Sequence, residues 1–523
     1  MSTSVWFPSV VTPTFLTREL LAVKGGQKAS AGGVYDDLFL RDGARVAKAI
    51  AKHHPGAAIA VLLALAQFQG EQADASTNEF PGALPHQVHR EFVGGMMSSP
   101  TLIEHSARYA STWGVAMRGS SHCGHHFAIY NDSDGQCLFV IVLRRLMQLH
   151  PRLNVLGREY RHWATNTTRS LAVAATEVLR FLVRMIHDSN LGLYEIPNTN
   201  PRQTSPSGAL FDGFDAYFHP AKDGIRPVNW RLVAYIHNQQ LAYEALLCGA
   251  ELFPDDRNVQ LWLDTADQLR RNAVRLFGLD SGTGFPPAAY DRDEFGRARP
   301  VHLESLASLE LLEGRFLSGL LTQTEIVRML VKWLYSEAVM TAVGPRCQPL
   351  KYAPLEGEYC PYQGTPSVWA IMDWIVAEGL HNQGLDPLFH DLALLRMTAG
   401  LDRSGTAIES WPVHRETGAV CYRPHETTTR GDADLVMACS EVGQLRQAWS
   451  ISSGLAALEA QAIGYRDVPG NSWQEQLCKE ALSAVSHIFP AADNRPEILI
   501  HIDLERGREL KAKRVAQMGL AAH

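Results

Sequence analysis

The chain has 523 residues, with 48 Lys or Arg against 55 Asp or Glu, so its formal net charge at neutral pH is −7. Hydrophobic residues make up 46% and charged residues 20%, a balance that excludes a disordered or fibrous chain. The mild acidity argues against a nucleic-acid partner, which favours a strong positive excess. Length alone favours roughly three or four domains.

The beginning of the chain lacks the order of charged, apolar and small residues that defines a signal peptide. The longest apolar run, at 57–66, is far shorter than the roughly 20 residues that a membrane span requires. The cysteines are scattered and none form a C-x-x-C pair, which is typical of reduced thiols. We therefore expect a cytoplasmic protein with no membrane partner.

Apolar segments with helical spacing recur along most of the chain. In several of them Leu, Val, Ile and Phe return every three or four residues, as in an amphipathic helix that faces a core. The alternating, β-branched runs typical of strands are few and short. The expected helices are 44–51, 57–68, 137–149, 171–186, 233–252, 259–277, 326–335, 367–380, 385–399, 449–463 and 473–488.

Long polar connectors separate these helices and are rich in Trp, Tyr, His, acidic residues, Pro and Gly. Loops longer than about 12–15 residues in a compact domain are usually functional or disordered, and these carry too many aromatic residues for disorder. Helix pairs joined by such loops predict a closed or stacked helical array. The connectors are 69–95, 188–229, 281–300, 346–366 and 400–429.

The first candidate site residues stand before predicted helices. Tyr35, Arg41 and Asp42 belong to an acidic, aromatic loop at the start of one helix. Asp42 is explained either as a helix cap or, with Arg41, as a group that binds sugar hydroxyls. Asp134 precedes the next such helix, and the same two explanations apply to it.

A proline and two acidic loops complete the candidates. Pro85 favours an extended loop, after which His86 and Gln87 are able to line a pocket. Asp212 and Asp215 flank a glycine among aromatic rings, a setting that raises the pKa of a carboxyl toward that of a general acid. Glu409, beside Trp411, could hold a water as a general base. Two carboxylates on separate loops are what glycoside hydrolysis requires.

The order of these motifs resembles the (α/α)6-barrel, or six-hairpin, glycosidases. This superfamily includes glucoamylases, the amylo-α-1,6-glucosidase module of debranching enzymes, trehalase, and processing α-glucosidases with their mannosyl- or glucosylglycerate hydrolase relatives. The motifs that carry the resemblance are Lys28-Ala29-Ser30 with Leu40-Arg41-Asp42-Gly43, then 82–90, 130–139, Asp212-Gly213-Phe214-Asp215, 362–369 with Gln363 and Trp369, 409–418, and Gln447-Ala448-Trp449-Ser450.

The resemblance implies an all-α protein with an (α/α)6 toroid and long active-site loops. It also implies an inverting hydrolase that needs no metal or other cofactor and acts on a small carbohydrate, an α-linked glucoside. Asp215 would be the general acid and Glu409 the general base. The barrel would span residues 28–490, between an N-terminal extension at 1–27 and a charged tail at 491–523. One barrel then replaces the three or four domains that length alone favours.

The chain departs from the superfamily pattern in its polar loops. Gln87 replaces a Glu, His89 replaces an Arg, and Asp212 replaces a Ser, which leaves Asp212 a rival to Asp215 as the acid. A binding protein that has lost turnover is one alternative. A phosphorylase on the same barrel would need a phosphate cradle, and an epimerase would need paired histidines such as His86, His89 and His414.

A histidine-rich segment at 121–126 is the one apparent metal cluster in the sequence. Zinc requires three or four convergent ligands, which this segment supplies only in part. We expect a polar loop there rather than a metal site.

Overall fold

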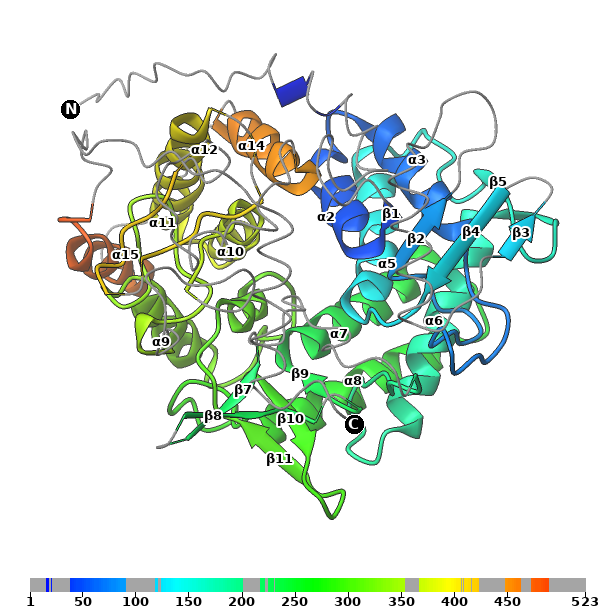
Figure 1. Ribbon diagram of the computed structural model, residues 1–523, viewed down its shortest axis with the longest axis horizontal. Helices are drawn as coiled ribbons and strands as arrows, with labels where there is room; N and C mark the ends of the chain where they lie inside the picture. Colours follow the sequence, from blue (N-terminus) through cyan, green and yellow to red (C-terminus); the bar gives the residue numbers. More distant parts are fainter. Residues whose placement is uncertain are drawn as a thin grey trace, which may run out of the picture.

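The computed structural model describes residues 16–17, 20, 38–90, 118–120, 124–200, 217–221, 224–229, 231–352, 366–405, 407, 409–414, 416–422, 447–461 and 472–488. Within these ranges the chain is mainly helical (Figure 1). The α-helices are α2 (Leu40–Ile50), α3 (Pro55–Ala66), α5 (Asp134–Leu149), α6 (Leu171–Asp188), α7 (Ile236–Leu252), α8 (Val259–Leu276), α9 (Gln323–Leu334), α10 (Ala370–Asn382), α11 (Asp386–Phe389), α12 (Thr398–Ser404), α14 (Ala448–Gln461) and α15 (Trp473–Ala484).

Two short 3-10 helices and one π-helical segment complete the helical elements: η2 (Leu306–Leu312), η3 (Leu350–Tyr352) and η4 (His390–Met397). Each apolar run predicted above coincides with a helix or, for 385–399, with α11, η4 and the start of α12. The sequence pattern did not predict η2, because seven residues are too few to display a helical period.

Short antiparallel strands lie between the helices. One sheet has the order β1-β2-β4-β3, a second has β11-β10-β9, and two hairpins pair β5 with β6 and β7 with β8. The strands are β1 (Leu38–Phe39), β2 (Gln87–Arg90), β3 (Arg118–Ser120), β4 (Gly124–Ile129), β5 (Glu159–Arg161), β6 (Thr168–Ser170), β7 (Phe218–Ala221), β8 (Gly224–Pro227), β9 (Ala234–Tyr235), β10 (Ala289–Arg292) and β11 (Ala298–Val301).

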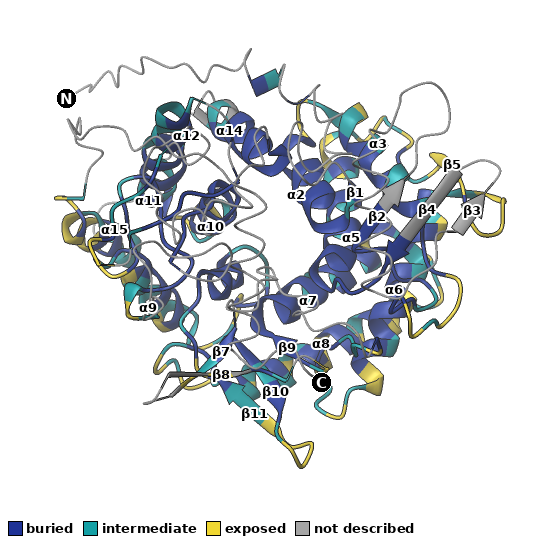
Figure 2. Ribbon diagram, viewed as in Figure 1, coloured by how far each residue is buried: buried dark blue, intermediate teal, exposed yellow. Residues whose placement is uncertain are grey.

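The helices form an inner and an outer layer. In α10 every residue from Ala370 to Ala377 is buried, as expected of a helix that is surrounded on all sides. In α8 only Trp262, Thr265, Ala266, Leu269 and Ala273 are buried, which is one stripe with helical spacing. Figure 2 shows the same contrast, with buried inner helices and exposed positions on the outer ones.

The inner elements contact one another in cyclic order. Among the described residues α2 contacts α5, α5 contacts α7, α7 contacts η2, η2 contacts α10, α10 contacts α14, and α14 contacts α2. In chain order each inner element up to α10 is followed by an outer helix that packs against it, as α3 does on α2 and α8 does on α7. Figure 1 shows these elements arranged around a common centre.

The inner elements begin at the same end of this ring. Asn238 near the start of α7 donates from Nδ2 to Ser133 Oγ, just before α5, at 2.5 Å. Leu306 N–H at the start of η2 donates to the carbonyl of Cys347, whose own N–H donates to the carbonyl of Ser367, just before α10. These bonds gather the first turns of the inner elements at one end.

The last turns of the inner elements meet at the opposite end. Lys48, near the end of α2, forms ion pairs with Glu313, just after η2, and with Glu378 of α10. Arg145, near the end of α5, also pairs with Glu378, at 3.1 Å. The inner elements therefore run in one direction, and the ring has a distinct N-terminal end and C-terminal end.

The segment predicted to precede the barrel contributes to the core. Leu16 and Leu20 are buried, and Leu16 lies against Gly454 of α14. No helix among the described residues is both long and apolar enough to cross a membrane.

Candidate active site

Arg41 and two aspartates form the centre of the site at the N-terminal end of the ring. Arg41 Nε lies 3.0 and 2.8 Å from the two carboxylate oxygens of Asp134, and Nη2 lies 3.5 Å from Asp132 Oδ1. The N–H of Gly135 donates to both aspartates, at 3.3 and 3.0 Å. Asp134 is the first residue of α5, so it contributes to the helix start and to the ion pair together.

The two aspartates are buried side by side, which makes their ionisation interdependent. Burial opposes the charge on Asp132, but Arg41 and hydrogen bonds from Asp134 and His86 outweigh it and hold its pKa below the usual range. Burial, reinforced by the repulsion from Asp132, raises the pKa of Asp134 well above its usual range. One guanidinium thus serves two neighbouring carboxyls whose pKa values shift in opposite directions.

Asp42 is not the cap of its helix. Helix α2 begins at Leu40 after Phe39, whose side chain makes no capping bond, and Asp42 lies buried in the first turn. The capping explanation of Asp42 is therefore wrong, because the helix starts two residues before it. Asp42 and Arg41 instead share the first turn of an inner helix.

The loop that follows Pro85 contacts the start of α2. The carbonyl of His86 accepts a hydrogen bond from Leu40 N–H at 2.9 Å, and Gln87 pairs with Phe39 between β2 and β1. The His86 Nδ1 lies 3.5 Å from Asp132 Oδ2, and its ring meets Phe39 edge-on. Both His86 and Gln87 are buried, and His86 lies next to Asp132, one of the two partners of Arg41.

A second group gathers where α10 and α14 begin. Val368 and Trp411 exchange two backbone hydrogen bonds, at 3.0 and 2.8 Å. This pairing brings the segment that carries Glu409 to the start of α10, and the Glu409 side chain is buried there. The N–H of Gln447, just before α14, donates to the carbonyl of Ala407 at 2.9 Å.

Three tryptophans, Trp369, Trp411 and Trp449, lie in or next to the first turns of α10 and α14. The rings of Trp369 and Trp449 meet edge-on with centroids 5.4 Å apart. Trp411 is fully buried and donates from Nε1 to Ser404 Oγ at 2.7 Å. In this structure Trp411 therefore packs in the core rather than lining a substrate site. The buried Nε1 of Trp449 has no hydrogen-bond partner in the described part of the chain.

The structure adds residues that the sequence did not single out for the site. Tyr235 and His237 lie at the start of α7, and Glu310 of η2 accepts hydrogen bonds from Arg45 Nη2 at 2.9 and 2.8 Å. One local signal could have identified His237. The order Tyr235-Ile236-His237 matches Phe39-Leu40-Arg41, with an aromatic, an aliphatic and a basic residue at the start of an inner helix.

The remaining predicted site residues, Tyr35, Asp212, Asp215 and Gln363, lie outside the described residues. So do residues 121–123 of the histidine-rich segment, whose continuation at 124–126 belongs to β4. Among the side chains that the structure describes, no group of three or more His, Cys, Asp or Glu is arranged to hold a metal ion.

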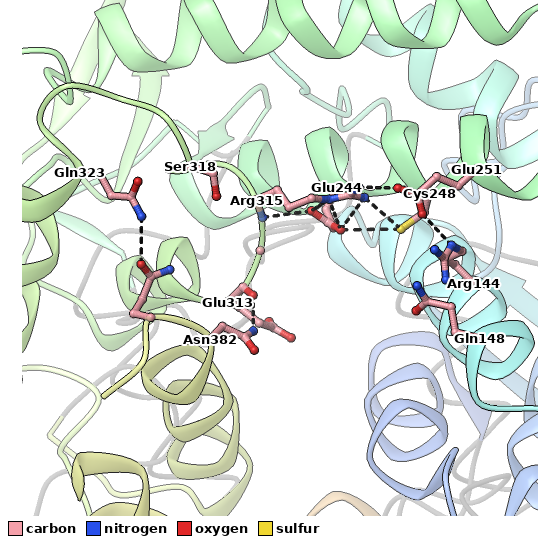
Figure 3. Close-up of a pocket in the computed structure, with 12 residues that line it drawn as sticks. Arg144, Gln148, Glu244, Cys248, Glu251, Glu313, Arg315, Ser318, Gln323 and Asn382 are labelled. Carbon is pink, nitrogen blue, oxygen red and sulfur yellow. Dashed lines mark hydrogen bonds and ion pairs between the residues drawn. The ribbon is translucent and has the colours of Figure 1, made fainter. Parts of the chain in front are cut away.

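A cavity of about 430 Å³ opens at the C-terminal end of the ring. Its lining is polar and its charges are paired: Arg315 reaches Glu244 and Glu251, and Arg144 Nε lies 2.6 Å from Glu251 (Figure 3). The cavity is distinct from the Arg41 group, because Arg144 lies 10 residues along α5 from Asp134, a rise of about 15 Å.

The layered helices, and the polar side chains of the Arg41 group at one end of the ring, agree with the resemblance to the six-hairpin glycosidases. Two solved structures share the fold: the GH63 mannosylglycerate hydrolase from Thermus thermophilus in complex with glucose, and the same enzyme in complex with Tris. Each has a TM-score of 0.50 and 16% sequence identity, and each match covers 85% of this chain and 99% of that chain.

This likeness concerns the fold, and it agrees with the resemblance that the sequence motifs carry. No protein-family model matches the chain, and no curated protein matches its sequence. The chain thus shares its helical fold with a glycoside hydrolase.

Proposed function

We propose that this protein is an inverting glycoside hydrolase on an (α/α)6 toroid, which acts on an α-linked glucoside. The substrate would be a short oligosaccharide or a glucosylated small solute. One observation carries the proposal: the buried Glu409 and the Arg41–Asp134 group both stand where inner helices of the ring begin. A glycosidase needs such a carboxylate facing a polar sugar site, and the likeness to a GH63 hydrolase supports the same reaction class.

In this mechanism Asp215 gives its proton to the glycosidic oxygen as the bond to the anomeric carbon breaks. Glu409 takes a proton from the water that attacks the opposite face of the ring. The new carbon–oxygen bond inverts the anomeric centre, so an α-glucoside yields β-glucose and a protonated leaving group. Room for the water requires about 6.5–9.5 Å between the two carboxyl groups.

Described residues close to Asp215 in the sequence, and the polar side chains at the N-terminal end of the ring, support these roles. Asp215 is two residues from Tyr217, which is fully buried and interacts electrostatically with Arg41 and Asp134. Asp42, His86, Gln87 and Asp134 would bind sugar hydroxyls together with Arg41, and Trp369 and Trp449 would contact the sugar faces. Asp212 stays a second candidate for the acid.

The test is to incubate the protein with α-linked disaccharides and glucosylated solutes and to follow the released sugar by NMR. We expect β-glucose first, and initial release of α-glucose overturns inversion. Glu409→Gln and Asp215→Asn should each reduce kcat by about 10³-fold or more with an unchanged melting temperature. Asp212→Asn is the matched control for the acid, and a larger loss in it than in Asp215→Asn would reassign that role.

One observation favours a second candidate, a sugar epimerase on the same barrel. Such an enzyme needs two histidines, and His237 interacts electrostatically with Asp132, the aspartate that His86 also contacts. His414, by contrast, accepts from two backbone N–H groups of the turn that follows it. Interconversion of free monosaccharides, followed by NMR in deuterated water, would separate an epimerase from a hydrolase.

A further inference from the structure

Tyr217, Tyr235 and His237 form a continuous group of polar aromatic side chains at the N-terminal end of the ring. At most 1% of each residue is exposed. The rings of Tyr217 and Tyr235 meet with centroids 4.8 Å apart, and the ring of Tyr235 lies 5.6 Å from that of His237. The group joins the start of β7 to the start of α7.

The polar atoms of this group have no partner among the residues that the structure describes. Tyr217 Oη, Tyr235 Oη and both ring nitrogens of His237 are buried there without a hydrogen bond. A buried polar atom left unpaired costs about 1–3 kcal/mol, so native proteins rarely keep several together unless something else satisfies them. Four such atoms in contacting residues point to a ligand with several hydrogen-bonding groups.

The charged side chains near Tyr217, Tyr235 and His237 already have partners of opposite charge. His237 interacts electrostatically with Glu310, Arg41, Arg45 and Asp132. Arg45 is bonded to Glu310, and Arg41 is bonded to the two aspartates. A charged substituent placed against Tyr217, Tyr235 and His237 would therefore be buried beside charges that already have partners, which is strongly unfavourable.

The histidine itself is uncharged at neutral pH. Burial is the main cause that lowers the pKa of His237 to about 4, with Arg41 and Arg45 acting in the same direction and Glu310 opposing them. A neutral imidazole offers one donor and one acceptor, and each phenol offers both. Hydroxyl groups also donate and accept, so they match this set of atoms.

We propose that Tyr217, Tyr235 and His237 bind uncharged hydroxyl groups of the sugar and select a neutral hexose over uronic acids and amino sugars. His237 acts in binding and transfers no proton. This inference rests on the proposed carbohydrate substrate, but it concerns binding and does not depend on turnover.

The test measures binding of D-glucose, its monodeoxy analogues, glucuronate and glucosamine by calorimetry. Wild type should bind glucose best, and His237→Phe should weaken glucose binding by about 10- to 100-fold. In His237→Phe at least one deoxy analogue should bind as well as glucose does. His237→Gln, which keeps a donor and an acceptor, should retain part of the discrimination.

Stability and pH separate a binding role from a structural or catalytic one. Because His237→Phe removes unpaired polar atoms, its melting temperature should equal or exceed that of the wild type. Its kcat against pH should keep the wild-type shape above pH 5, whereas a proton-transfer role would remove one limb of the profile.

Two results overturn the inference: glucose binding by His237→Phe equal to wild type, or no binding of any of these sugars to wild type. Sugar binding with the expected selectivity but without hydrolysis would refute only the proposed catalysis. Hydrolysis with unchanged selectivity in His237→Phe would refute only the binding role.

Discussion

The two ends of the inner ring use buried polar residues in opposite ways. At the C-terminal end Lys48, Arg145, Glu313 and Glu378 form a network in which each charge faces an opposite one. At the N-terminal end Arg41 is shared by two carboxyls, while Tyr217, Tyr235 and His237 have unpartnered atoms among the described residues. The N-terminal group is more deeply buried: the side chains of Arg41, Asp132 and Asp134 are at most 5% exposed, whereas that of Arg145 is 36% exposed.

This difference in pairing distinguishes polar groups that stabilise the fold from polar groups that are available to bind a ligand. An ion pair that is complete within the protein stabilises one arrangement of the helices and offers little to a small molecule. Unsatisfied atoms destabilise the free protein, and binding a ligand recovers that energy. The cavity in Figure 3 lies at the end where the charges are paired.

The largest effect is expected for Arg41→Met at the N-terminal end. The variant leaves Asp132 and Asp134 buried without their cation, which should lower the free energy of unfolding by about 3–5 kcal/mol. Urea denaturation measures the loss. Arg41→Lys is the control that keeps the charge, and a loss below about 1 kcal/mol in Arg41→Met would contradict the role assigned to this residue.

A smaller effect is expected for Glu378→Gln at the C-terminal end. Lys48 keeps Glu313 as a partner and Arg145 is partly exposed, so the loss of stability should be about 2 kcal/mol. The rate of hydrolysis should be unchanged after correction for the folded fraction. A large fall in kcat would show that the two ends are coupled and that their separation by function is wrong.

The ion pairs of Glu378 also make the stability of the protein depend on pH. Burial opposes the charge on Glu378, but Lys48 and Arg145 overcome it and lower the pKa to about 2. In the unfolded chain this pKa is about 4.5, so the carboxylate contributes stability above that pH and loses it as the pH falls toward 2. Denaturation between pH 5 and 2 should be steeper for wild type than for Glu378→Gln, and equal slopes would contradict the pairing.

The smallest effect is expected on the outer layer. Arg271 and Asp267 form an exposed pair one turn apart on α8. Arg271→Ala should change the free energy of unfolding by less than about 0.5 kcal/mol, because water screens both charges. This variant is the reference for the variants at the two ends of the ring. A loss of stability as large as that of Glu378→Gln would show that buried and exposed ion pairs contribute equally.

Much of the helical layout was predictable from local patterns. The spacing of Leu, Ile and Val in 259–277 or 171–186 reports a buried face because a helix brings residues three and four apart together. The end of α7 at Leu252 is also a local effect, because Pro254 has no backbone N–H to continue a helix. The predicted helices are therefore confirmed. The pattern did not predict η2, because seven residues are too few to show a helical period.

The sequence by itself determined the positions of the helices and of the polar segments between them, and it indicated a mainly helical fold. Only the tertiary structure decided which side chains meet. Arg41 and Asp134 are 93 residues apart, and Arg45 and Glu310 are 265 apart. Such pairs depend on how the ring closes, and no local pattern records that. His237 shows the same limit, because its burial beside Tyr235, with no hydrogen-bond partner among the described residues, follows from what packs around it.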